Sequence, residues 1–274
     1  MSATSRRGMV SLPDGGRLSY ECSGAASLQL PLLLLRPLGG SMALWGRFAA
    51  RLGAGREVIA FDPRGVGESS APPLGHTTRA MAADARVLLD ALGRERVHVF
   101  GLSLGGMVAS WLAVDAAARV SRLVLASTLP RASKISRRVR HEAWPLLRAM
   151  LRPGVAAEIA LVHQILSAQF RRAHPDRVRA IDALVRAHPT AKRNLLALAL
   201  AAARHDLNAE LAAIAAPTLV LVGELDPIVG KRADAELLHG IAHATLAVVA
   251  SSGHDLSLEQ PDDAAGQIDA FLSG

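Results

Sequence analysis

The 274-residue sequence has a single cysteine, Cys22, and few aromatic side chains. One cysteine excludes a disulfide within the chain and a cysteine-rich metal site. Aromatic residues make up only 3% of the chain, so there is little surface on which nucleic-acid bases could stack. The longest bulky apolar run, residues 30–35, contains a proline and is far too short to span a membrane. There is no repeat of fixed period, which argues against a solenoid or a propeller.

The N-terminal region does not have the composition of a secretory signal. The first ten residues are polar, include Arg6 and Arg7, and are not followed by an apolar segment. We therefore expect a cytoplasmic protein without a membrane partner. Half of the residues are hydrophobic and 20% are charged, which is enough apolar material for one large core.

Lysine is scarce, since only three of the 31 basic residues are lysines and the others are arginines. The net charge of +7 comes from one segment: residues 131–206 carry 15 basic and 5 acidic side chains, and the rest of the chain carries 16 and 19. With so few aromatics, this distribution predicts no nucleic-acid partner. The basic segment could steer an anionic substrate by its field, or its arginines could simply form a solvated surface.

Short apolar runs alternate with helical patterns along most of the chain. Continuous apolar runs of strand length, typical of buried parallel strands, occur at residues 32–35, 58–61, 97–100, 123–126, 218–222 and 245–249. Helical patterns occur at 42–52, 78–92, 104–114, 232–241 and 262–272, and a hairpin is predicted at 9–21. This alternation predicts an α/β fold, a mostly parallel central sheet with helices on both faces.

One long interval, residues 131–206, breaks the alternation. It contains no strand-like run and has a helical pattern interrupted at three proline positions, 153, 175 and 189. We interpret this interval as an inserted helical cap over a core formed by residues 1–130 and 207–274. Trp144 in this interval is a candidate pocket residue.

A sharp turn between a predicted strand and a predicted helix carries a serine. Residues 101–105 read Gly-Leu-Ser-Leu-Gly, and they follow the run at 97–100 and open the helix at 104–114. This strand–turn–helix context is typical of the G-x-S-x-G elbow, which exposes a serine hydroxyl at the carboxyl edge of a sheet, beside a helix N-terminus. The sequence therefore predicts Ser103 as a nucleophile.

A serine nucleophile needs a base and an acid that orients the base. His254 follows the predicted strand at 245–249, and Asp226 follows the predicted strand at 218–222. Both loops are expected at the sheet edge that carries Ser103. Glu224 is an alternative acid, but we favour Asp226 because it comes after the turn.

Two backbone N–H groups are candidates for an oxyanion hole. One belongs to Leu104, directly after the nucleophile, and the other comes from the loop after residues 32–35. Pro37 has no N–H, so Leu38 is the best candidate in that loop. Arg36, directly before Pro37, is a second candidate pocket residue, although its side chain could equally face a structural carboxylate. This chemistry requires no metal and no cofactor.

Together these motifs resemble the α/β-hydrolase superfamily. Residues 61–69, Phe-Asp-Pro-Arg-Gly-Val-Gly-Glu-Ser, resemble its D-x-R-G-x-G-x-S loop, which is structural in the family, so Asp62 is not assigned to catalysis. The chain from residue 170 onward is similar to 3-oxoadipate enol-lactone hydrolases. Arg36-Pro37 departs from the His-Gly of many members. The resemblance implies a serine hydrolase that cleaves a carboxylic ester or lactone through an acyl-enzyme.

Other functions share this fold and triad and stay open. They include carbon–carbon bond hydrolysis, thioester hydrolysis, and perhydrolase or cofactor-free oxygenase chemistry. The resemblance argues against haloalkane dehalogenase and epoxide hydrolase activity, because those relatives have an aspartate in place of Ser103. A non-catalytic ligand-binding protein is less favoured, because all three triad residues are present. The sequence does not indicate an oligomeric state.

Overall fold

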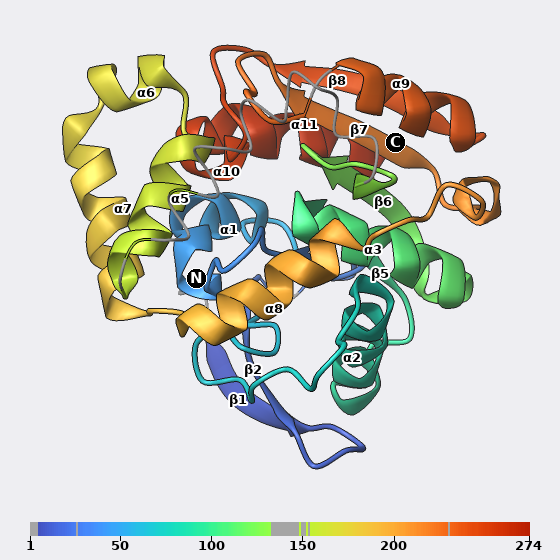
Figure 1. Ribbon diagram of the computed structural model, residues 1–274. Helices are drawn as coiled ribbons and strands as arrows, with labels where there is room; N and C mark the ends of the chain where they lie inside the picture. Colours follow the sequence, from blue (N-terminus) through green and yellow to red (C-terminus); the bar gives the residue numbers. More distant parts are fainter. Residues whose placement is uncertain (1–4, 26, 133–147, 149–151, 153, 230) are drawn as a thin grey trace.

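The structure of the protein is a computed structural model, which describes residues 5–25, 27–132, 148, 152, 154–229 and 231–274. Eight strands form one sheet in the order β1-β2-β4-β3-β5-β6-β7-β8 (Figure 1). β1 (Arg6–Ser11) and β2 (Arg17–Gly24) form an antiparallel hairpin. β2 also pairs antiparallel with β4 (Glu57–Phe61).

All other neighbouring strands are parallel. These strands are β3 (Leu32–Leu35), β5 (Val97–Leu102), β6 (Val120–Ala126), β7 (Thr218–Gly223) and β8 (Ala244–Val249). Each predicted apolar run falls inside one strand, so the predicted mostly parallel sheet is confirmed.

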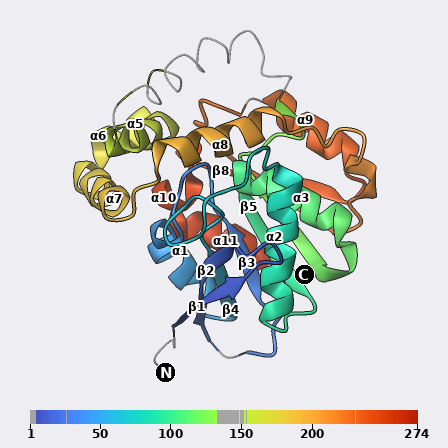
Figure 2. The same cartoon turned by 60° about the horizontal axis from the view of Figure 1, so that its bottom comes forward.

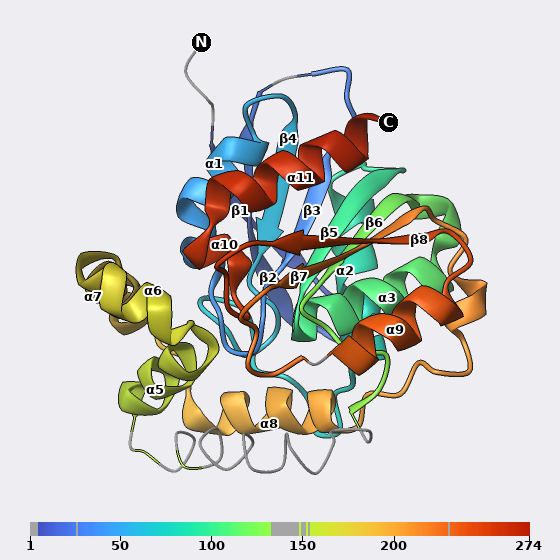
Figure 3. The ribbon, with the colours of Figure 1, turned by 90° about the horizontal axis from the view of Figure 1, so that it is seen from above.

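Helices cover both faces of this sheet (Figure 3). One face carries α1 (Gly46–Leu52), which follows the 3₁₀ turn η1 (Met42–Trp45), and α11 (Pro261–Ser273). The other face carries α2 (Thr78–Ala91), α3 (Leu104–Asp115) and α9 (Lys231–Gly240).

Strand β3 shows why the apolar runs are continuous. Leu33 and Leu35 pack in the core on the α2 and α3 face, whereas Leu32 and Leu34 pack with Phe48 of α1 on the other face. Successive side chains of a strand point to opposite faces of a sheet. Because β3 is buried on both faces, it is apolar at every position.

The described part of the connection between β6 and β7 includes the helices α5 (Val155–Ile165), α6 (Ala168–Ala173), α7 (Pro175–Ala187) and α8 (Lys192–Ala203). They lie outside the two helical layers, on the side away from the N-terminus (Figures 2 and 3). Within this connection, Arg131 and Asp206 lie side by side and form an isolated antiparallel bridge. The chain thus leaves the sheet layers and returns to them at one place.

Three short elements complete the described chain: η2 (Ala117–Arg119), η4 (Leu211–Ala213) and α10 (Leu256–Glu259). Among the helices of the described residues, none is long and apolar enough to cross a membrane.

Candidate active site

Ser103 occupies the turn between β5 and α3 with φ 56° and ψ −117°. A serine at positive φ is strained by about 1–3 kcal/mol and persists only where its surroundings hold it. The Ser103 N–H donates to the Ala126 carbonyl at 2.9 Å. Thr128 Oγ1 donates to the Ser103 carbonyl at 2.7 Å. Strand β6 and the loop after it therefore hold the serine in its strained conformation.

Close backbone contacts explain the glycines on either side of the serine. A Cβ atom on Gly101 would collide with the backbone of Gly105, and a Cβ atom on Gly105 would collide with the carbonyl of Leu35. Only glycine therefore lets α3 begin this close to β3 and β5. The close approach fixes the N-terminus of α3, and with it the Leu104 N–H, next to Ser103.

His254 and Asp226 come together from the loops after β8 and β7. His254 Nδ1 lies 2.9 Å from Asp226 Oδ2 and 3.1 Å from Oδ1, and both side chains are only 3% exposed. Glu224, the alternative acid, instead accepts the Ser251 N–H at 2.9 Å. The carboxylate that contacts the histidine is therefore that of Asp226.

Burial and pairing act in opposite directions on this pair. Burial lowers the pKa of His254, but the adjacent Asp226 carboxylate outweighs burial and raises that pKa above its ordinary 6.5. Burial raises the pKa of Asp226, but His254 and the N–H groups of Ile228 and Val229 lower it overall. Asp226 therefore stays ionised and favours proton uptake by His254, as a general base near neutral pH requires.

The loop that carries His254 is fastened to the junction of α5 and α6. The His254 N–H donates to the Ile165 carbonyl at 3.0 Å. The fully buried Glu259 carboxylate accepts the Ser167 N–H at 2.8 Å and the Ser167 hydroxyl at 2.6 Å. The helices between β6 and β7 thus help to position the histidine.

Arg36, a predicted pocket residue, borders the cavity but pairs with a buried carboxylate. Its Nη2 lies 2.9 Å from Asp255 Oδ2, and the two side chains are 1% and 0% exposed. The guanidinium also lies over the Trp45 ring, 4.3 Å from its centroid. Because Asp255 directly follows His254, this ion pair joins the loop after β3 to the loop after β8.

Leu38 and Leu104, whose N–H groups are predicted for an oxyanion hole, line the same cavity as Ser103. Leu104 is the first residue of α3, so its N–H has no acceptor within the helix. The Leu38 N–H forms no backbone hydrogen bond in the part of the chain that is described. Two donors without backbone partners are therefore available beside the serine.

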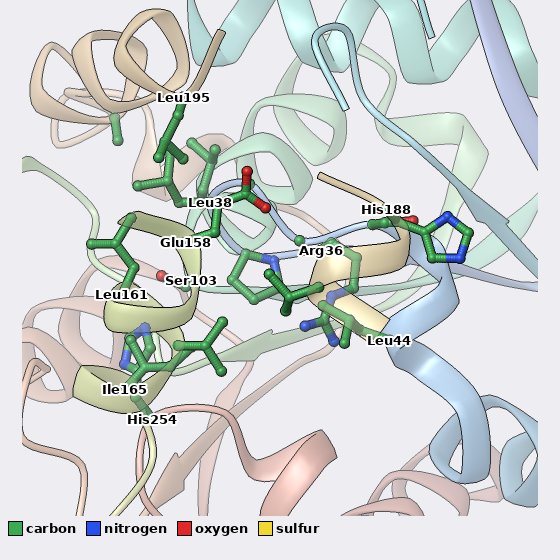
Figure 4. A pocket seen from close by; sticks show the side chains of 18 of the residues that line it. Arg36, Leu38, Leu44, Ser103, Glu158, Leu161, Ile165, His188, Leu195 and His254 are labelled. Carbon is green, nitrogen blue, oxygen red and sulfur yellow. The ribbon is translucent and has the colours of Figure 1, made fainter. Parts of the chain in front are cut away.

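A cavity of about 170 Å³ lies over Ser103 and His254 (Figure 4). Its walls are mainly apolar and come from the loop after β3, from η1 and from helices α3, α5, α7 and α8. Their side chains include Leu38, Leu44, Met107, Leu161, Val162 and Ile165. The predicted pocket residue Trp144 lies outside the described residues. A cavity below the roughly 300–1,000 Å³ of drug-sized pockets suits a small substrate.

Sequence reasoning missed Glu158 on α5, a polar residue of the cavity wall. It is the one carboxylate among the described residues that line this cavity. The sequence does mark this residue, because Glu158 is the one charged residue in the otherwise apolar helical stretch 155–162. It lies one helical turn before Leu161 and Val162. Within the described chain, no group of three or more His, Cys, Asp and Glu side chains is placed to hold a metal ion.

Comparisons with known proteins agree with this architecture. Residues 31–261 match the family described as alpha/beta hydrolase fold. The provisionally named carbamate hydrolase RutD of Variovorax paradoxus is 35% identical over 246 residues, which cover 89% of this chain and 91% of that protein. The 3-oxoadipate enol-lactonase 1 of Acinetobacter baylyi is 27% identical over 258 residues, 93% of this chain and 92% of that protein.

A solved structure leads to the same family. A hydrolase from Pseudomonas aeruginosa PA01 is 29% identical and superposes with a TM-score of 0.83, covering 98% of this chain and 99% of the other. The names of these relatives are those of hydrolases. The chain therefore belongs to the alpha/beta hydrolase fold family, as its motifs predicted.

Proposed function

We propose that the protein is a serine hydrolase that cleaves a carboxylic ester or lactone through a Ser103–His254–Asp226 triad. The observation that carries the proposal is the buried His254–Asp226 contact of 2.9 Å beside a cavity that Ser103 also lines. A strained serine at a strand–helix turn completes the arrangement that nucleophilic acyl transfer needs.

In the proposed mechanism, Ser103 Oγ attacks the substrate carbonyl while His254 Nε2 takes the hydroxyl proton. Asp226 holds the other ring nitrogen and stabilises the imidazolium. The Leu38 and Leu104 N–H groups donate to the oxyanion, and one such donor contributes about 3–4 kcal/mol to the transition state. His254 then protonates the leaving alcohol and activates the water that releases the acid.

The proton path from serine to histidine is completed when substrate binds. Ser103 Oγ forms no hydrogen bond with a described residue in this structure. Catalytic hydrogen bonds in hydrolases without substrate are often long and tighten in the complex.

Residues 131–206 are proposed to form the cap over this site. Helices α5, α7 and α8 supply cavity walls through Leu161, Val185 and Leu195. The basic side chains of this segment that the structure describes are mostly exposed, and none of them lines the cavity. These positions support the solvated-surface interpretation of the basic charge.

Carbamate hydrolysis is a second candidate, favoured by the 35% identity to the carbamate hydrolase relative. It uses the same acyl transfer on a carbonyl that carries nitrogen. Thioester, carbon–carbon bond, perhydrolase and oxygenase reactions would use the same triad, so only substrates can separate these activities.

The test combines active-site labelling with a substrate panel. We expect a fluorophosphonate probe to label the wild-type protein, and p-nitrophenyl esters, lactones, a carbamate and a thioester to rank the activities. Ser103→Ala is expected to abolish labelling and to lower kcat by roughly 10⁶-fold. Ser110→Ala is the matched control, because the Ser110 hydroxyl only donates to the Gly106 carbonyl within α3. Labelling or turnover that survives Ser103→Ala would disprove the proposal.

A further inference from the structure

Glu158 is a buried carboxylate at the cavity that the proposed reaction does not use. The residue is 5% exposed and lines the same cavity as Ser103 and His254 (Figure 4). A buried carboxylate is costly unless hydrogen-bond donors or a cation compensate it. Among the described residues, the one hydrogen bond to its carboxyl group comes from the Thr190 N–H, at 2.5 Å from Oε1.

Thr190 fixes one oxygen of this carboxyl group and leaves the other available. The Thr190 hydroxyl donates to the Gly39 carbonyl at 3.1 Å, so the segment between α7 and α8 is itself attached to the loop after β3. Glu158 Oε2 has no hydrogen-bond partner in the described chain, and the side chain lines the cavity. A rigidly held acceptor therefore borders the cavity.

The other ionisable side chains that line the cavity do not neutralise Glu158. Arg36 is paired with Asp255, and His254 is paired with Asp226. His188 is exposed, and its ring points away from Glu158 (Figure 4). Within the described residues, the cavity thus offers an acceptor without an available cation.

We propose that Glu158 binds the substrate by accepting a hydrogen bond from an N–H or ammonium group, and that it disfavours a carboxylate at the same place. The inference rests on the proposed hydrolase function and names the substrate class: a small ester, lactone or carbamate that carries nitrogen with at least one hydrogen. It argues against the alternative of an anionic substrate, because the basic side chains described in 131–206 lie outside the cavity.

The protonation behaviour of the side chain agrees with this role. Burial raises the pKa of Glu158 to about 7, and the Thr190 N–H offsets only part of the rise. An ammonium or N–H donor at the free oxygen stabilises the ionised form. Binding of such a substrate therefore offsets the free-energy cost of burying the charge.

The test uses two matched substrate series, because the donor can lie on either side of the scissile bond. One compares the p-nitrophenyl esters of β-alanine and butanoate. The other compares para-(aminomethyl)phenyl, para-ethylphenyl and para-carboxyphenyl acetates. In at least one series, the kcat/KM ratio of ammonium to neutral substrate is expected to fall by ~10-fold or more in Glu158→Gln. The para-carboxyphenyl ester, relative to the neutral ester, is expected to gain by a similar factor.

Asp182→Asn is the matched control, because this cap carboxylate pairs with His163 at 2.8 Å and does not line the cavity. Its ratios are expected to equal those of the wild type. Equal ratios in wild type and Glu158→Gln, with the neutral esters still hydrolysed, would overturn the assignment of Glu158 and leave the hydrolase proposal standing.

Binding to Ser103→Ala protein gives the same comparison without catalysis. Calorimetry with para-(aminomethyl)phenol and para-ethylphenol is expected to show a preference for the amine that Glu158→Gln removes. A missing preference contradicts the Glu158 assignment even if no ester is turned over. Absent fluorophosphonate labelling at Ser103 would instead refute the hydrolase function.

Discussion

Replacing Arg36 with methionine removes the cation of a buried ion pair next to the site. Asp255 then loses its Nη2 partner at 2.9 Å. Among the described residues, the carboxylate keeps the Ser257 hydroxyl at 2.5 Å and the Leu258 N–H at 3.2 Å, both on its other oxygen. Methionine fills much of the vacated volume, so the dominant effect is an uncompensated charge in a part of the protein without solvent.

The expected magnitude follows from that burial. Breaking a buried ion pair by removing one partner destabilises a protein by about 3–5 kcal/mol. A domain has roughly 5–15 kcal/mol of stability in total, so the variant should fold but be markedly weaker. At ~2–4 °C per kcal/mol for a domain of this size class, Tm is expected to fall by about 6–20 °C.

Urea denaturation followed by circular dichroism measures the change, with thermal melts as a second readout. The double variant Arg36→Met/Asp255→Asn is expected to be more stable than Arg36→Met, because it removes the unpaired charge. Asparagine also keeps a side-chain oxygen at the N-cap of α10, where Asp255 accepts the Leu258 N–H. Arg47→Met is the control. Arg47 pairs with Asp262 where the side chains are 72% and 53% exposed, so its loss should cost less than about 1 kcal/mol.

Two outcomes would refute this reasoning. One is a loss below ~1 kcal/mol for Arg36→Met, which would put the buried pair in the range of surface pairs. The other is a double variant no more stable than the single one, which would show that the uncompensated Asp255 charge is not the cause.

Two further predictions concern the histidine and the elbow. The pKa of His254 is raised and the base must be neutral, so the acid limb of the kcat/KM profile is expected above pH 6.5. Asp226→Asn should move this limb to lower pH and reduce kcat by roughly 10⁴-fold. A limb that stays in place in the pH–rate profile of Asp226→Asn would contradict the assigned pairing. Gly105→Ala should abolish folding or fluorophosphonate labelling, because the new Cβ meets the Leu35 carbonyl. Gly266→Ala is the comparison, since open space surrounds its new Cβ. This variant should raise the free energy of unfolding by ~0.5–1 kcal/mol in the same denaturation assay.

Local sequence patterns were sufficient to predict the sheet and the elbow. Strand β3 is apolar at each position because both faces are covered, and this is visible in the sequence as an unbroken run. The turn at Ser103 is likewise local, since the glycines that it needs lie within two residues. The match of residues 31–261 to the hydrolase family confirms the resemblance based on these motifs.

Contacts between distant segments could not be predicted in this way. Arg36 and Asp255 are 219 positions apart, and no periodicity relates them, so the partner of Arg36 stayed open between a substrate and a carboxylate. Glu158 was missed because a single acid in an apolar helix indicates neither a cavity nor its neighbours. The roles of Ser103, His254 and Asp226 in catalysis and the division into core and cap stay predictions.

The bridge between Arg131 and Asp206 has a consequence for protein engineering. A chain segment that departs and rejoins at adjacent points can be exchanged for one of another length without altering the strand order of the sheet. One requirement of such a transplant comes from the His254 N–H, which now donates to Ile165. A donor segment must present a carbonyl at that position, or the histidine loop loses an anchor and the exchange alters the rate as well as the selectivity.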